Sequence, residues 1–143
     1  VYYGDEAGVC GFTDPDNRRT YPWGYENKEL IAFHKEMIRI HKEHPALRTG
    51  SLNILNGEEY NILAYGRFEG DDRIVVIINN RSELAEVTVP VWLAEVPVKC
   101  RMKKLLYSYH DGYSTDYEEY LVENGEVVVN MGAYSALVLS DLP

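Results

Sequence analysis

The residues of this sequence best suited to chemistry are the acidic and basic side chains of the run Asp14-Pro15-Asp16-Asn17-Arg18-Arg19. Sugar hydroxyls are bound by planar groups that donate and accept hydrogen bonds, and a carboxylate beside a guanidinium supplies both. Asp14 and Arg18 can form this pair across one turn of a loop. The run is equally typical of a solvated surface turn, because Asp, Asn and Pro are common turn residues. Both interpretations stay open at this point.

Two further groups of residues flank this run. The aromatic rings of Tyr21-Pro22-Trp23-Gly24 can stack on a sugar ring or anchor the loop, and the sequence favours neither role. Asp5 and Glu6 are adjacent, whereas the two carboxylates of a glycosidase flank the scissile bond about 5–5.5 or 6.5–9.5 Å apart. Neighbouring residues of a strand point to opposite faces. We therefore interpret Asp5 and Glu6 as polar groups at a strand end.

Metal and nucleophile chemistry has little support in the sequence. The histidines and cysteines are His34, His41, His44, His110, Cys10 and Cys100. His41 and His44 lie three residues apart on a predicted helix, but no third ligand with zinc-like spacing is near them. The two cysteines form no CxxC motif, and they are either two free thiols or one disulfide. We expect no metal site and no cofactor in this chain.

Two elements position the polar run. Val1-Tyr2-Tyr3 reads as a short apolar strand, and the long loop that follows it to about Asn27 exceeds the length typical of compact domains. Such loops are usually functional or disordered. Apolar residues at helical spacing then predict a helix over residues 28–44, with Asn27 as its N-cap and Pro45 as its stop.

The rest of the chain contains only strand patterns. The predicted strands are Leu52–Leu55, Ile62–Phe68, Ile74–Ile78, Glu86–Val91, Lys103–Tyr109, Tyr120–Val122, Glu126–Asn130 and Ser135–Leu139. Turn residues separate them, including Asn56-Gly57 and Asn124-Gly125, which are strong hairpin signals. Many short strands at this spacing favour an antiparallel sandwich or barrel.

Charge and composition exclude several functions. The chain has 143 residues and a formal net charge of −9, which argues against a nucleic-acid partner and against docking on anionic membranes. The 12 tyrosines and two tryptophans suit either strands or sugar-stacking surfaces.

Four segments together resemble the α-amylase family of glycoside hydrolases. Val1-Tyr2-Tyr3-Gly4-Asp5-Glu6-Ala7-Gly8 resembles the "YYG-x-E" segment of its eighth barrel strand, and the run from Asp14 to Trp23 resembles its "DP-x-NRR-x-PW" loop. His44-Pro45-Ala46-Leu47-Arg48-x-Gly50 is similar to the end of its last barrel helix. Val75-Val76-Ile77-Ile78-Asn79-Asn80 resembles the central strand of its C-terminal domain. The neopullulanase, cyclomaltodextrinase and amylopullulanase branch is the most similar.

The resemblance implies a mainly β fold and a fragment of a larger enzyme. Residues 1–49 would be the remnant of a truncated TIM barrel (strand 8, substrate loop, helix 8), and residues 50–143 a C-terminal antiparallel β-sandwich. The parent would be a retaining hydrolase of α-1,4 glucosidic bonds, with α-1,6 bonds as an open alternative. Its three catalytic carboxylates would precede this chain, so that no catalytic residue is expected here. Asp14 and Arg18 match the residues that bind a glucose unit at the −2 subsite. The expected partner is an α-glucan or maltooligosaccharide.

Several alternatives remain open. The chain can instead be a stand-alone carbohydrate-binding or structural β-sandwich. The apolar stripe of the helix and the residues at the start of the chain would be covered in one of two ways. Either the helix folds back on the sandwich, or two chains pair as a homodimer through these segments. The resemblance leaves open a calcium ion in the parent, and it leaves open whether the parent is cytoplasmic or secreted.

Overall fold

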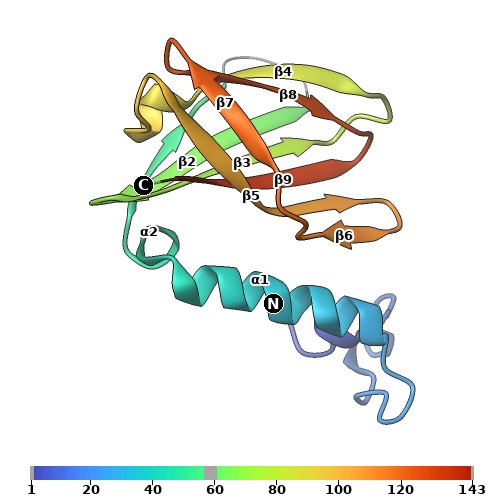
Figure 1. Cartoon of the computed structure of the whole chain (residues 1–143). Coiled ribbons are helices and arrows are strands. Elements are labelled where there is room, and N and C mark those ends of the chain that lie inside the picture. Colours follow the sequence, from blue (N-terminus) through green and yellow to red (C-terminus); the bar gives the residue numbers. More distant parts are fainter. Residues whose placement is uncertain (1, 57–60, 143) are drawn as a thin grey trace. The chain divides into compact units, whose positions relative to one another are not determined.

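The computed structural model describes residues 2–56 and 61–142. The chain divides into two units, residues 1–40 and residues 41–143 (Figure 1). The division falls inside the long helix α1 (Lys28–Glu43), whereas the expected boundary follows residue 49. The first unit carries the polar run, and the second carries the strands.

The first unit holds two short 3₁₀ helices, η1 (Asp5–Ala7) and η2 (Asp16–Arg18), followed by α1. The strand predicted over residues 1–3 is wrong for Tyr2 and Tyr3, and Val1 lies outside the described residues. The chain turns here instead, because the Tyr2 amide donates to Asp5 Oδ2 at 2.8 Å and the Asp5 amide donates to the Tyr2 carbonyl at 3.2 Å. A parallel strand needs neighbouring strands to satisfy its backbone, and the described residues 2–40 contain none.

The predicted helix is confirmed within one residue of its ends. The Asn27 side chain accepts a hydrogen bond from the Leu30 amide at 3.0 Å, so Asn27 is the N-cap of α1. Pro45 does not simply end the helix, because it opens the short helix α2 (Pro45–Arg48). Asp72 binds this junction with both oxygens, one 2.9 Å from the Ala46 amide and one 2.7 Å from His44 Nδ1.

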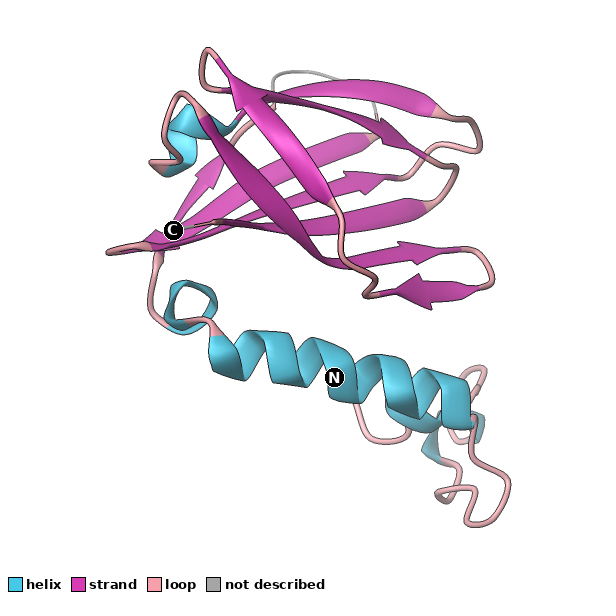
Figure 2. Cartoon of the chain, in the orientation of Figure 1, coloured by secondary structure: helices cyan, strands magenta, loops and turns pink. Residues whose placement is uncertain are grey.

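The second unit is one continuous antiparallel sheet in the order β1-β2-β3-β9-β5-β7-β8-β4, with β6 paired to β5 (Figure 2). The strands are β1 (Ser51–Ile54), β2 (Ile62–Glu69), β3 (Asp72–Asn79), β4 (Ala85–Pro90), β5 (Cys100–Tyr109), β6 (Gly112–Ser114), β7 (Glu119–Glu123), β8 (Glu126–Met131) and β9 (Ser135–Asp141). The antiparallel, mainly β fold is therefore confirmed. The short strand β6 and the 3₁₀ helix η3 (Val91–Ala94) are additions to the predicted elements.

The sheet curls so that β4 and β8 lie across from β2 and β3, as Figure 2 shows. Inward-facing residues from both layers form the hydrophobic core, including Val75, Ile77, Val87, Val127 and Leu137. Each of these side chains is at most 1% exposed. The alternation of buried and exposed residues along β4 and β8 explains why these strands were visible in the sequence.

The hairpin signal at Asn124-Gly125 is confirmed, because this pair joins β7 to β8 and both residues have positive φ, 53° and 83°. The Asn56-Gly57 signal extends into residues 57–60, outside the described part of the chain. A close approach requires glycine at residue 66, where an added Cβ would lie 2.3 Å from the Cβ of Ala94 in η3. This contact packs η3 directly on β2.

Candidate functional site

The candidate site is the loop between η1 and α1, and its two ends are tied together. The Asn27 amide donates to the Ala7 carbonyl at 3.1 Å, so the chain leaves η1 and returns beside it at the start of α1. Residues 8–26 thus form one closed loop, which is the arrangement typical of compact functional surface loops. The polar run occupies its middle.

Within this loop Asp14 and Arg18 form the pair that their spacing predicts. Arg18 Nε donates to Asp14 Oδ1 at 2.7 Å, and its Nη2 donates to the other oxygen of the same carboxylate. This is the two-bond geometry in which a guanidinium fork matches a carboxylate. Pairing with Asp14 raises the pKa of the Arg18 guanidinium above its ordinary value, so Arg18 remains charged.

A second pair, Asp16 and Arg19, holds the turn that carries the first. Arg19 Nε and Nη2 donate to the two Asp16 oxygens at 2.8 and 3.0 Å. Asp16 also accepts from the Phe12 amide at 3.0 Å, and the Arg19 carbonyl accepts from the Tyr3 hydroxyl at 3.1 Å. The hydrogen bonds from Arg19 and Phe12 lower the pKa of the Asp16 carboxyl below its ordinary value. The Asp16–Arg19 pair was not predicted from the sequence, although the three-residue spacing of the two side chains was a signal for it.

The Asp14–Arg18 pair faces solvent, with its side chains 60% and 64% exposed. Each carboxylate oxygen has a lone pair beyond the one that Arg18 uses, and a guanidinium has five N–H donors, of which this pair occupies two. The site can therefore accept from one hydroxyl and donate to its neighbour. Vicinal hydroxyls of a sugar ring fit this pattern.

The neighbouring aromatic and acidic residues take structural positions. The rings of Tyr21 and Trp23 lie 4.6 Å apart at 52°, and Trp23 is 80% exposed. Tyr21 thus supports a tryptophan that remains open to solvent. Asp5 accepts the Tyr2 amide, as expected of a capping carboxylate rather than a catalytic one.

No group of three potential metal ligands gathers within residues 2–56 and 61–142. His41 and His44 do not share a site, since His44 is directed at Asp72. Both cysteines are free thiols. Of the described helices, none has the length and apolar character that crossing a membrane requires.

The two thiols differ in exposure, and we expect alkylation rates to follow this difference. Cys10 is exposed in the loop, whereas Cys100 is partly buried in β5, and burial together with the nearby Asp141 raises the pKa of the Cys100 thiol. Because the thiolate is the nucleophile, we expect iodoacetamide at pH 8 to label Cys10 several-fold faster than Cys100. Mass spectrometry of the time course checks this order, and equal rates would contradict it.

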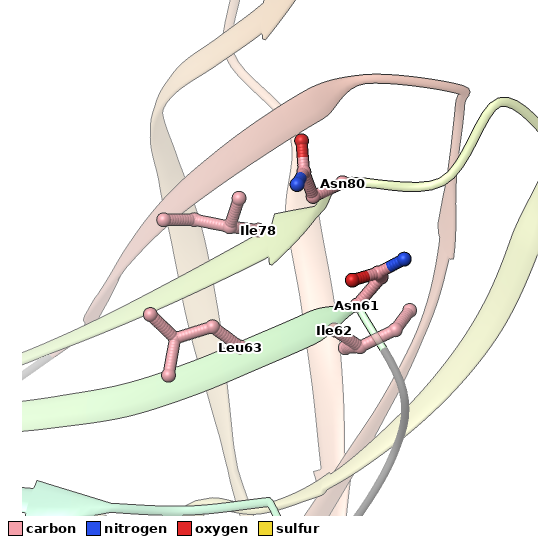
Figure 3. Close-up of a pocket in the computed structure, with 5 residues that line it drawn as sticks. All are labelled: Asn61, Ile62, Leu63, Ile78 and Asn80. Carbon is pink, nitrogen blue, oxygen red and sulfur yellow. The ribbon is translucent and has the colours of Figure 1, made fainter.

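A pocket of about 300 Å³ lies in the second unit, where β2 begins and β3 ends (Figure 3). Its lining comprises the apolar side chains of Ile62, Leu63 and Ile78 and the amides of Asn61 and Asn80. The described residues that line this pocket include no titratable or nucleophilic side chain.

Comparison with known proteins points to one group of enzymes. No protein-family model matches the chain. An amylopullulanase of Thermoanaerobacter thermohydrosulfuricus is 32% identical over 154 residues, which cover 99% of this chain and 10% of that protein. A cyclomaltodextrinase of Geobacillus thermopakistaniensis is 38% identical over 94 residues, covering 64% of this chain and 16% of that protein.

The solved structures agree with the sequence relatives. An α-amylase from Anoxybacillus matches 99% of the chain with a TM-score of 0.81 and 24% sequence identity, over 28% of its own length. This structural likeness establishes the shared fold. The chain spans between a tenth and a sixth of the length of the two curated relatives described above.

Proposed function

We propose that this chain, which is related in sequence and in fold to the α-amylase family of glycoside hydrolases, is the C-terminal part of a retaining α-glucan hydrolase. The parent enzyme would cleave α-1,4 and in some substrates α-1,6 glucosidic bonds. The exposed Asp14–Arg18 pair carries the proposal, because it is presented by a loop with the family's sequence pattern. The small share of each relative that the chain covers also supports it.

In this enzyme the loop would bind the glucose unit at the −2 subsite, which is separated from the reacting bond by the −1 unit. Asp14 would accept hydrogen bonds from ring hydroxyls, and Arg18 would donate to them. The Asp16–Arg19 pair would keep the loop in one conformation, so that little ordering entropy is lost when the sugar binds. Binding energy gained at such a remote position helps to orient the substrate at the reacting bond.

The catalytic carboxylates would come from the part of the enzyme that precedes this chain. In retaining hydrolysis one carboxylate attacks the sugar and forms a covalent intermediate, while a second donates and then removes a proton. Asp5, Asp14 and Asp16 are unsuited to these roles, since each accepts hydrogen bonds that hold the loop. We assign all three to binding or structure.

The isolated chain is therefore expected to be inactive as a hydrolase. Purified chain incubated with pullulan, soluble starch and cyclomaltodextrin should release no reducing sugar above the protein-free control. The complete reading frame should release sugar whose fresh anomeric centre is α, as proton NMR would record. Hydrolysis by the pure chain, lost on Asp14→Asn, would contradict the assignment of Asp14 to binding.

A further inference from the structure

The second unit carries a large exposed aromatic side chain that the candidate loop does not include. Trp92 in η3 is 52% exposed, although its neighbours Val91 and Ala94 are fully buried in the core. The helix is thus anchored by its apolar residues and presents the indole outward. A tryptophan that is exposed on a well-anchored element presents an aromatic ring in a fixed position, on which an apolar face of a ligand can stack.

The backbone around Trp92 is fixed by the turn between β7 and β8. The Trp92 amide donates to the Gly125 carbonyl at 3.1 Å, and the Gly125 amide donates to the Val98 carbonyl at 2.8 Å. On the other side, the Glu95 amide donates to the Trp92 carbonyl at 3.0 Å. These three backbone hydrogen bonds fix the part of η3 that carries the indole, without any contribution from a ligand.

Gly125 also supports the ring itself. A Cβ added at this glycine would lie 2.9 Å from Trp92 Cδ1 and 3.1 Å from Cγ, so the indole rests directly on the turn. A side chain at residue 125 would push the ring away, and the positive φ of 83° would strain it as well. One side of the indole is therefore occupied by backbone, and the remainder faces solvent.

The exposed polar residues of the two segments that meet at Trp92 suit a neutral, hydroxyl-rich ligand. The turn that touches it carries the exposed side chains of Glu123, Asn124 and Glu126, and Glu95 is exposed at the end of η3. Carboxylate and amide groups bind hydroxyls, while the apolar face of a pyranose ring stacks on an aromatic ring. The surrounding carboxylates disfavour phosphate and other anions.

We propose that Trp92 is a second glucan-binding position, at which a pyranose ring of an α-glucan chain stacks on the indole. This inference rests on the proposed function, since it takes the same class of substrate. It places the position on η3 and the β7–β8 turn, within the second unit, so a long glucan can be held there independently of Asp14 and Arg18.

The two tryptophans of the chain make a direct test possible, because Trp23 and Trp92 are its only indoles. Trp23→Phe leaves Trp92 as the sole indole emitter. We expect maltoheptaose to change this emission saturably, and we expect the change to persist when Arg18→Ala is added. Gly125→Val, which displaces the ring, should weaken the response at least ten-fold, whereas Leu121→Ala, an exposed apolar residue on β7, should leave it unchanged.

Three outcomes would overturn the inference. The first is an unchanged Trp92 emission while calorimetry still detects maltoheptaose binding that depends on Arg18, and this result leaves the proposed function intact. The second is a change in Trp92 emission that a β-linked cellooligosaccharide produces to the same extent as maltoheptaose, without saturation by maltoheptaose. The third is a response to tetramethylammonium alone, which would identify a cation site. If maltoheptaose changes the Trp92 emission saturably and Arg18→Ala does not alter maltoheptaose affinity, the result supports the inference about Trp92. The same result counts against sugar binding by the loop.

Discussion

Replacing Arg18 by alanine is expected to weaken maltoheptaose binding about 10- to 100-fold, because a hydrogen bond to a charged group contributes roughly 1.5–3 kcal/mol. The change removes the donor of the pair and leaves Asp14 as an isolated acceptor. Arg18→Lys keeps the charge but loses the fork that matches the carboxylate, so its affinity should be intermediate. Titration of the chain by calorimetry measures the dissociation constants.

The matched control for Arg18 is Arg39→Ala. Arg39 forms a similar pair with Glu36 on α1, with Nε 3.0 Å from the nearer carboxylate oxygen, but it lies outside the loop. Its removal should leave maltoheptaose affinity unchanged. If Arg18→Ala and Arg39→Ala behaved alike while the loop stayed folded, the Asp14–Arg18 pair would not be a sugar contact.

The second large effect concerns Asn79, whose side chain is only 1% exposed at the end of β3. Its Nδ2 donates to the Glu83 and Gly132 carbonyls at 2.9 and 2.8 Å, and its Oδ1 accepts from the Arg81 amide at 3.0 Å. This amide thus joins β3 to two connecting segments. Asn79→Ala removes the side-chain amide to which these backbone groups are hydrogen-bonded, and an unsatisfied buried group costs about 1–3 kcal/mol. We expect the free energy of unfolding to fall by about 3 kcal/mol.

The neighbouring Asn80 provides the control for this prediction. Asn80 is exposed and lines the pocket in Figure 3, so Asn80→Ala should change the free energy of unfolding by less than about 0.5 kcal/mol. Urea unfolding of both variants, followed by circular dichroism, supplies the comparison. Equal midpoints for Asn79→Ala and wild type would show that the buried amide does not stabilise the fold.

Features that depend on local sequence were predicted well. The strands β4 and β8 alternate between buried and exposed residues, the Asn124-Gly125 turn requires positive φ at both positions, and α1 has a capping Asn27. The approach of Asp14 to Arg18 was also predictable, because these residues are four positions apart in the same loop. Each of these signals is contained within a few neighbouring residues.

Features that depend on distant partners were not predictable. A strand at residues 1–3 needs neighbours to pair with, and apolar character alone could not reveal that the described residues around it form none. The strand predicted over Ile74–Ile78 ends before Asn79, although contacts with Glu83 and Gly132 make Asn79 a buried link between β3 and two connecting segments. The composition indicated only that the two tryptophans suit strands or sugar stacking, whereas the approach of Trp92 to Gly125 shows that this indole is held in place.

The most direct test of the central claim is to read the DNA immediately upstream of the Val1 codon. The proposed function predicts that the reading frame continues upstream for on the order of 200–400 residues, the size of a β/α barrel, with alternating strand and helix patterns. It also predicts Asp, Glu and Asp residues at successive strand ends in that region. A start codon within a few residues of Val1 would contradict the account, since the chain would then be a protein without the catalytic part that we assign to it.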